Sequence, residues 1–325
     1  MRLAAIDCGT NTALMLVADV VGPDAAGAAT TSRLRAVGDF LEMPRLGQDL
    51  DRTGRLHPEA IERGVAAIGR QLARARELGV DKLIAVGTES LRAASNSGVF
   101  LSRLTELGLP LRIISSDDEA RLSFDSVVKS LGMPPGGRCS VLDIGGGSTE
   151  LIVGGDRPER WASVKIGSVR LTERLLPSDP PTPAEQQALI ATVQQAIAAL
   201  PTPEGELVAL AGTATTLAAI HLGLPAHDSA RIDGLRLPTA ALADLAQRLG
   251  ELPVAQRKQL PGLDPRRADV IYAGAVILWQ IALHAGVREV VISDRGVRWG
   301  VLEEVVAEVV AEVVAEAVAK PRAGQ

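Results

Sequence analysis

Residues 141–153 place a glycine-rich turn between two short apolar runs, and no other stretch constrains the fold as strongly. Runs of β-branched and aliphatic residues on both sides of glycines predict a β-hairpin. Glycine lets the backbone approach a ligand closely, and the free N–H groups and hydroxyls of such a turn can hold a phosphate. Asp143 and Glu150 flank the turn, which favours a divalent cation or an attacking water between them and the phosphate. A plain hairpin with solvated acids would give the same pattern.

The same plan occurs a second time near the N-terminus. Residues 4–17 again place an aspartate, Asp7, and a Gly/Thr/Asn turn between two apolar runs, 136 positions before Asp143. A second motif also recurs in the same order, since Gly87-Thr88 reappears 125 positions later as Gly212-Thr213. Two motifs repeated in order at similar offsets predict two related halves that face one cleft.

Composition limits the class of ligand. A chain of 325 residues is long enough for two domains that each bury a core. Aromatic residues make up 2% of the chain, so platforms for stacking bases are scarce, which argues against a dedicated nucleic-acid binder. The net charge of −5 repels polyanions, so a phosphate substrate requires a local basic groove.

The sequence favours a cytoplasmic protein with no membrane partner. Its two cysteines make no disulfide framework. Asp7 interrupts the N-terminal apolar run too early for a signal peptide, and no uncharged run reaches membrane-spanning length. The four histidines show no metal-ligand spacing, so we expect them to be structural.

Domain boundaries follow from the proline and glycine residues at 132–137. We expect an N-terminal domain at 1–132 and a C-terminal domain at 133–325. Residues 25–31 predict a loop before a third strand at 31–40, and a buried helix is expected from Asp264 to Leu283. The Glu-Val-Val-Ala repeat from Glu304 onward predicts a terminal helix that packs on the body or on a second chain, which makes a homodimer possible.

Four charged residues have competing interpretations. Arg92 follows Gly87-Thr88 near the start of a helix, and a phosphate contact is favoured over a surface ion pair. Ser116-x-x-Glu119 fits a capping box, and from the residues alone Glu119 serves the helix N-terminus. Lys165 and Arg170 are equally suited to a basic groove wall and to a solvated edge.

The motifs together resemble one known family. The loops at 7–12 and 143–150, and the motifs at 87–96, 119–121 and 293–298, are similar to those of the exopolyphosphatase/guanosine pentaphosphate phosphatase (Ppx–GppA) family. The resemblance covers nearly the whole chain. It implies an α/β fold with two ribonuclease-H-like domains, of the type shared with actin, hexokinase and Hsp70, around a cleft. The family motif more often has serine where this chain has Thr10 and Thr12.

The resemblance also implies an activity. The family removes the terminal phosphate of inorganic polyphosphate or of guanosine pentaphosphate (pppGpp) by water attack, and its Glu-Ala-Arg glutamate, which Glu119 matches, is the base. We therefore expect Glu119, Asp143 and Glu150 to be catalytic, and Mg²⁺ or another divalent cation to be bound by Asp143, Glu150 and Asp7. The expected phosphate-binding residues are Gly9, Thr10, Asn11, Thr88, Arg92, Gly145, Gly146, Gly147, Ser148, Gly212 and Thr213.

Other functions remain open on the sequence. The main alternative is a catalytically weak sensor that binds guanosine tetra- or pentaphosphate. A sugar or acetate kinase would need an acceptor pocket, for which the sequence has no signature, and an actin-like filament is weaker still. The polar segment at 47–56 and the arginines Arg295 and Arg298 have no assigned role, although both arginines are suited to a phosphate or a base.

Overall fold

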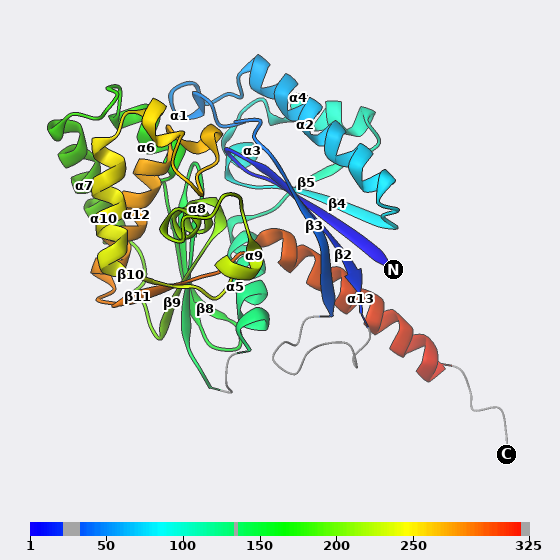
Figure 1. Ribbon diagram of the computed structural model, residues 1–325. Coiled ribbons are helices and arrows are strands. Elements are labelled where there is room, and N and C mark those ends of the chain that lie inside the picture. The colour runs from blue at the N-terminus through cyan, green and yellow to red at the C-terminus, as the bar shows by residue number, and fades with distance from the viewer. Residues whose placement is uncertain (22–32, 133–135, 320–325) are drawn as a thin grey trace.

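The chain forms two α/β halves, each built around one mixed sheet (Figure 1). The computed structural model describes residues 1–21, 33–132 and 136–319, with residues 310–319 by their backbone alone. The expected loop at 25–31, three residues of the proline-glycine segment and the end of the tail lie outside this part. Within it, no helix is long and apolar enough to cross a bilayer.

The first sheet has five strands in the order β3-β2-β1-β4-β5. β1 pairs antiparallel with β2 and parallel with β4, and β2 pairs antiparallel with β3. The third expected strand is therefore present, at 34–42. The strands are β1 (Arg2–Cys8), β2 (Ala13–Val20), β3 (Leu34–Glu42), β4 (Lys82–Gly87) and β5 (Leu111–Ile113).

The second sheet repeats this order and adds one edge strand, giving β10-β11-β9-β6-β7-β8. β6 takes the place of β1, because it pairs antiparallel with β7 and parallel with β9. This duplicated order confirms the expected pair of ribonuclease-H-like domains. The strands are β6 (Cys139–Ile144), β7 (Thr149–Gly154), β8 (Pro158–Val164), β9 (Glu206–Leu210), β10 (Arg236–Pro238) and β11 (Glu289–Ile292).

One face of each sheet is covered by helices of its own half. In the first half, α2 begins after the cap His57 with Pro58 at its first position, and its apolar stripe packs with Phe100 and Leu104 of α4. The helices of this half are α1 (Leu50–Thr53), α2 (Pro58–Glu77), α3 (Glu89–Ala93) and α4 (Ser97–Glu106).

The second half buries α12 on nearly all sides, as its apolar sequence predicts. This helix begins at Ile271 rather than at Asp264, because Asp264 caps a separate 3-10 turn, η2 (Pro265–Arg267). The helices are α6 (Ser168–Leu175), α7 (Pro183–Ile197), α8 (Ala211–His221), α9 (Ser229–Ile232), α10 (Thr239–Glu251), α11 (Val254–Arg257) and α12 (Ile271–His284).

The last helix of each half packs on the sheet of the other half. α5 (Ser116–Leu131) places Phe124 and Val127 against Val141 and Ile152 of the second sheet. α13 (Val297–Ala319) packs with Leu3 and Leu16 of the first sheet and also contacts α5. The expected boundary near residue 132 remains a prediction, and these two helices cross it in opposite directions (Figure 1).

Candidate active site in the interdomain cleft

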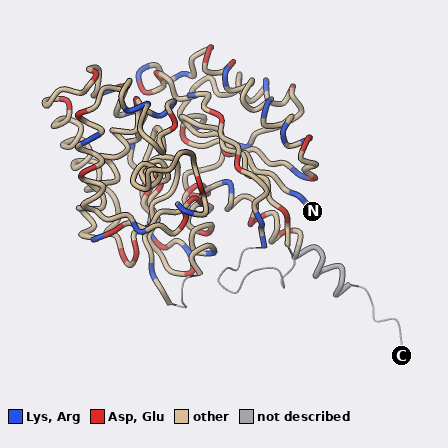
Figure 2. The backbone as a smooth tube through the Cα atoms, in the orientation of Figure 1, with Lys and Arg blue, Asp and Glu red and all other residues tan. Residues whose placement is uncertain are grey.

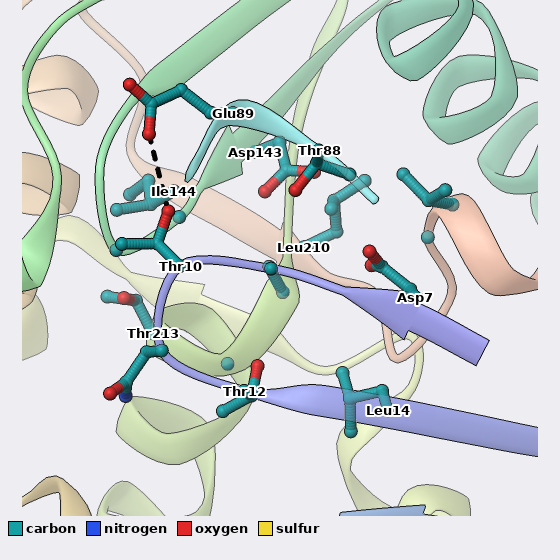
Figure 3. Close-up of a pocket in the computed structure, with 18 of the residues that line it drawn as sticks. Asp7, Thr10, Thr12, Leu14, Thr88, Glu89, Asp143, Ile144, Leu210 and Thr213 are labelled. Atoms are coloured by element: carbon teal, nitrogen blue, oxygen red, sulfur yellow. Dashed lines mark hydrogen bonds between the residues drawn. The ribbon is translucent and has the colours of Figure 1, made fainter. Parts of the chain in front are cut away.

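A pocket lies where the carboxyl ends of β1 and β6 face each other. Its walls are the turns after these strands, the residues that follow β4 and β9, and the first residues of α5 and α13. Figure 3 shows Asp7, Thr10, Thr12, Thr88, Asp143 and Thr213 around this space. Every site residue expected from the sequence lines the pocket except Arg92.

The two turns have the same geometry. In the first, the N–H of Gly9 donates to the carbonyl of Thr12 at 2.9 Å, and in the second the N–H of Gly145 donates to the carbonyl of Ser148 at 3.0 Å. The paired strands continue in equivalent register, since Cys8 is opposite Ala13 and Ile144 is opposite Thr149. The turns are therefore structural equivalents.

The carbonyl groups of both turns are occupied from outside the cleft. The N–H groups of Gly47 and Arg45 donate to Thr10 and Asn11 at 2.8 and 3.1 Å. Residues 168–170 at the start of α6 donate in the same way to the carbonyls of Gly145 and Gly146.

The N–H groups of the two turns are left for a ligand. Within the described part of the chain, those of Thr10, Asn11, Gly146 and Gly147 have no hydrogen-bond acceptor. Consecutive free N–H groups form an anion-binding concavity. The pocket thus has two such concavities, one from each half.

Four carboxyl groups gather beside these turns. Asp143 and Glu150 are directly opposite each other on β6 and β7, Asp7 is the last residue but one of β1, and Glu119 comes from α5. Burial and, to a smaller extent, the charge of Glu119 together raise the pKa of Asp7 to about 7. Burial and the Glu119 charge likewise raise the pKa of Glu150 to about 7. Burial, with the charges of the other three acids, holds the pKa of Asp143 well above its usual range.

Glu119 does not cap its helix. The cap is Ser115, whose hydroxyl accepts from the N–H of Asp118 at 3.0 Å, so the expected capping box is wrong by one residue. Glu119 instead faces the cleft and is 8% exposed. Burial raises its pKa, although the Arg92 guanidinium opposes this shift from 2.6 Å. Arg92 also donates to the carbonyl of Ile114, so it holds Glu119 rather than lining the pocket.

The acids suit a hard cation held in part by substrate. Asp7 Oδ1 is buried without a hydrogen-bond partner, and carboxylate oxygens are the ligands that Mg²⁺ prefers. Among the described residues, no three His, Cys, Asp or Glu side chains converge closely enough to bind a metal by themselves. Mg²⁺ is typically bound by one or two carboxylates together with substrate phosphates, and one or two of Asp143, Glu150 and Asp7 would meet that requirement.

Arg267 is one of the site residues that the sequence did not reveal. Its guanidinium faces both this pocket and a neighbouring one, and burial lowers its pKa to about 10. A Cβ atom on Gly212 would lie 1.8 Å from Arg267 Nη1, so glycine at 212 makes room for the guanidinium. No carboxylate of the described residues pairs with Arg267.

The strand register shows that the repeat of the Gly87-Thr88 motif is offset by one residue from the match expected with Gly212-Thr213. Val86 is opposite Asp7 and Leu210 is opposite Asp143, so Gly87 corresponds to Ala211 rather than to Gly212. Ala211 has a φ of 67°, a left-handed conformation that a residue other than glycine seldom adopts. Gly212 and Thr213 lie in the first turn of α8 and line the pocket.

The remaining basic candidates have different roles. Arg295 lines both pockets, and its guanidinium stacks 3.7 Å above the ring of Trp299, without a paired carboxylate in the described residues. Arg298 is buried and pairs with Asp39 at 2.8 Å. Lys165 is exposed and does not line the cleft.

Arg170 ties the two halves together. It donates to the carbonyl of Gly147 at 2.7 Å and pairs with Glu89 at 2.8 Å and with Asp51. Glu89 was not expected in the site, yet it lines the pocket and accepts from Thr10 Oγ1 at 3.4 Å (Figure 3). Arg170 is therefore neither a solvated edge nor an open phosphate ligand.

Comparisons with known proteins agree with this architecture. A sequence model of the Ppx/GppA phosphatase family matches residues 30–308. Exopolyphosphatase 2 of Mycobacterium tuberculosis is 37% identical over 315 residues, which cover 92% of this chain and 97% of that protein. Exopolyphosphatase 1 of Mycobacterium leprae is 31% identical over 287 residues, covering 85% and 81%. The crystal structure of the Aquifex aeolicus Ppx/GppA family member is 30% identical with a TM-score of 0.77, covering 95% and 98%. This chain belongs to the Ppx/GppA phosphatase family.

Proposed function

We propose that this protein is an exopolyphosphatase that hydrolyses the terminal phosphoanhydride bond of inorganic polyphosphate or of pppGpp. One observation carries the proposal: two equivalent turns, whose N–H groups have no acceptor among the described residues, lie beside four buried or half-buried carboxyl groups. The turns suit a terminal phosphate, and the acids suit a cation and an attacking water. The relatives that are named exopolyphosphatases support the same activity.

Glu119 is the proposed base. Its raised pKa favours proton transfer near neutral pH, and Arg92 fixes its side chain. The water gives its proton to Glu119 as its oxygen bonds to the terminal phosphorus, and the bond from phosphorus to the bridging oxygen breaks. The shortened chain leaves with that oxygen. Mg²⁺ on Asp143, Glu150 and Asp7 would neutralise charge on the leaving phosphate.

Arg267 and Arg295 are the proposed contacts for the next phosphates of the substrate. Both line the terminal-phosphate pocket and its neighbour, and neither is neutralised by a paired carboxylate of the described residues. Elsewhere, basic and acidic residues are interspersed over both halves (Figure 2). Local arginines therefore have to attract the polyanion to a chain whose net charge is −5.

The neighbouring pocket favours pppGpp as a second substrate. It has a volume of about 430 Å³ and is lined by Leu14, Leu41, Leu260 and Leu263 as well as by polar groups. Apolar walls offer nothing to a bare phosphate chain, whereas they fit the base and ribose of a nucleotide. Mg²⁺ dependence, a cytoplasmic location and a homodimer remain predictions.

The deciding experiment measures phosphate release from long-chain polyphosphate and from pppGpp, each with Mg²⁺ and with chelator. It compares wild type with Glu119→Gln and with Asp118→Asn, an adjacent acid outside the pocket. We expect Mg²⁺-dependent release that falls by about 10²- to 10⁴-fold in Glu119→Gln and persists in Asp118→Asn. Binding of pppGpp without release from either substrate would instead establish the sensor.

A further inference from the structure

We propose that Arg45 is a positioning residue that holds the two phosphate-binding edges of the cleft at a fixed separation. It acts through residues 45–51, which we call the clasp. The inference rests on the proposed function, because it gives the start of the polar segment at 47–56 a role in holding the phosphate-binding site. Arg45 lies outside both pockets, so it acts through other residues rather than on substrate.

The backbone of the clasp supports the first phosphate turn from behind. The N–H groups of Arg45 and Gly47 donate to the carbonyls of Asn11 and Thr10. The fit is tight, because a Cβ atom on Gly47 would lie 2.1 Å from Thr10 Cγ2. The clasp therefore determines where the free N–H groups of this turn point.

The side chains of the clasp reach the other half of the molecule. The Arg45 guanidinium binds Asp269 through two hydrogen bonds of 2.6 and 2.8 Å, and it donates to the carbonyl of Arg266 at 2.6 Å. Two further contacts cross the cleft. Asp51 forms an ion pair with Arg170, and the backbone N–H of Asp49 donates to the carboxylate of Glu173.

The backbone of the clasp is strained at two of these positions. Arg45 and Asp49 have φ values of 53° and 56°, and neither is a glycine. Such conformations persist where the surrounding contacts over-determine them, and they gather at binding sites and clamps. Strain at two residues that both contact the opposite half indicates that the cross-cleft contacts fix this segment.

The contacts of Arg45 join the two ends of a single phosphate-binding path. Its backbone supports Asn11, and its side chain holds the chain segment from Arg266 to Asp269, which carries Arg267. A polyphosphate bound by both edges needs them at one separation. Without the contact between Arg45 and Asp269, each edge would still form, but the two would no longer be held in place relative to each other.

The test compares Arg45→Asn, Asp269→Asn and the double variant with Arg70→Asn. Asparagine tolerates the left-handed backbone of position 45. Arg70 is a matched control, because it makes a similar two-bond contact with Glu42 inside the first half. Calorimetry with inorganic tripolyphosphate measures affinity, and phosphate release gives KM and kcat.

A separate readout follows the width of the cleft. Spin labels at Ala73→Cys on α2 and Arg248→Cys on α10, both exposed, report the distance between the halves. Both native cysteines are fully buried, so the labels react at the introduced sites.

We expect Arg45→Asn, Asp269→Asn and the double variant each to weaken tripolyphosphate binding and raise KM about tenfold, with a smaller change in kcat. The distribution of distances between the two spin labels should become broader. The double variant should be no worse than Arg45→Asn, because that variant already removes the contact with Asp269. The proposal would be overturned if these variants had the same tripolyphosphate affinity and the same label distances as Arg70→Asn. It would also be overturned if the label distances broadened while the affinity stayed unchanged. Wild type that binds tripolyphosphate but releases no phosphate would refute the proposed hydrolase and leave the clasp to be decided by affinity and distance.

Discussion

The two hairpins that form the cleft share a backbone and differ in their side chains. Aligned at an offset of 136 positions, Thr10 and Asn11 of the first turn correspond to Gly146 and Gly147 of the second. A Cβ atom on Gly146 would lie 3.1 Å from Thr10 Cβ, and one on Gly147 would lie 2.3 Å from Glu89 Oε2. The first turn thus provides side chains, and the second provides the space for them.

The acids are distributed just as unequally. Glu150 is opposite Asp143 on the second hairpin, whereas the equivalent partner of Asp7 on the first is Leu14. One hairpin therefore presents a pair of carboxylates to the cleft and the other a single one. The difference teaches that the duplicated backbone supplies anion-binding N–H groups twice, while the paired hairpin acids occur only in the second copy.

Removing Glu150, the acid that has no counterpart in the first hairpin, should have the largest effect on catalysis. Glu150→Gln preserves shape but removes half of the carboxylate pair, and we expect kcat to fall by about 10²- to 10³-fold. Leu14→Met, at the equivalent position of the first hairpin, should stay within about threefold of wild type. Steady-state phosphate release measures both. Similar losses in the two variants would show that the hairpins contribute equally.

Filling the space in the second turn should have the next largest effect. Gly147→Ala would push against Glu89, which Arg170 holds in place, so we expect kcat/KM to fall about 10- to 100-fold. Gly145→Ala is the matched control, because its Cβ would meet only the Ser148 carbonyl, at 3.3 Å. The complementarity of the turns would be disproved by equal kinetics for the two variants.

Asp7, the cleft-facing acid of the first hairpin, should make stability depend on pH. Burial raises the pKa of Asp7 to about 7 in the folded protein, so its contribution to stability is complete below the unfolded value near 4 and is lost as pH rises through 7. Asp7→Asn removes this titration and should raise Tm by several degrees at pH 8, but not at pH 5. Thermal unfolding in chelator measures the change.

The control for this prediction is Asp19→Asn. Arg2 lowers the pKa of Asp19, so this acid is already ionised in both states across that pH range, and its variant should unfold in parallel with wild type. A variant of Asp7 whose Tm follows the same parallel course would contradict the burial argument.

The smallest effect is expected at Thr10. Thr10→Ser keeps the hydroxyl that donates to Glu89 and removes only the methyl group that lies against Gly47 and Gly146. We expect kcat/KM to stay within about threefold of wild type and stability to fall by about 1 kcal/mol. A much larger loss of activity would mean that the methyl group sets the spacing of the two turns.

The sequence predicted the hairpins because each one encodes its own structure within about fourteen residues. It also placed Asp7, Asp143 and Glu150 in one cleft, since the repeat requires both turns to face each other. It did not predict that Gly212 makes room for the Arg267 guanidinium, because only the folded chain brings η2 to the start of α8. Glu119 was ambiguous for a different reason. The residue that pairs with the helix cap is Asp118, one position before Glu119, and sequence pattern does not fix the start of a helix to within one residue.

The exchange of α5 and α13 has a consequence for the order in which the chain folds. During synthesis the first sheet is complete once β5 has formed, yet the helix that covers one of its faces, α13, follows every other described element. Leu3, Ala5 and Leu16 therefore stay open to water or to chaperones until the ribosome has made almost the entire protein. A polypeptide that stops before α13 therefore lacks the helix that covers these residues, although its first sheet is complete.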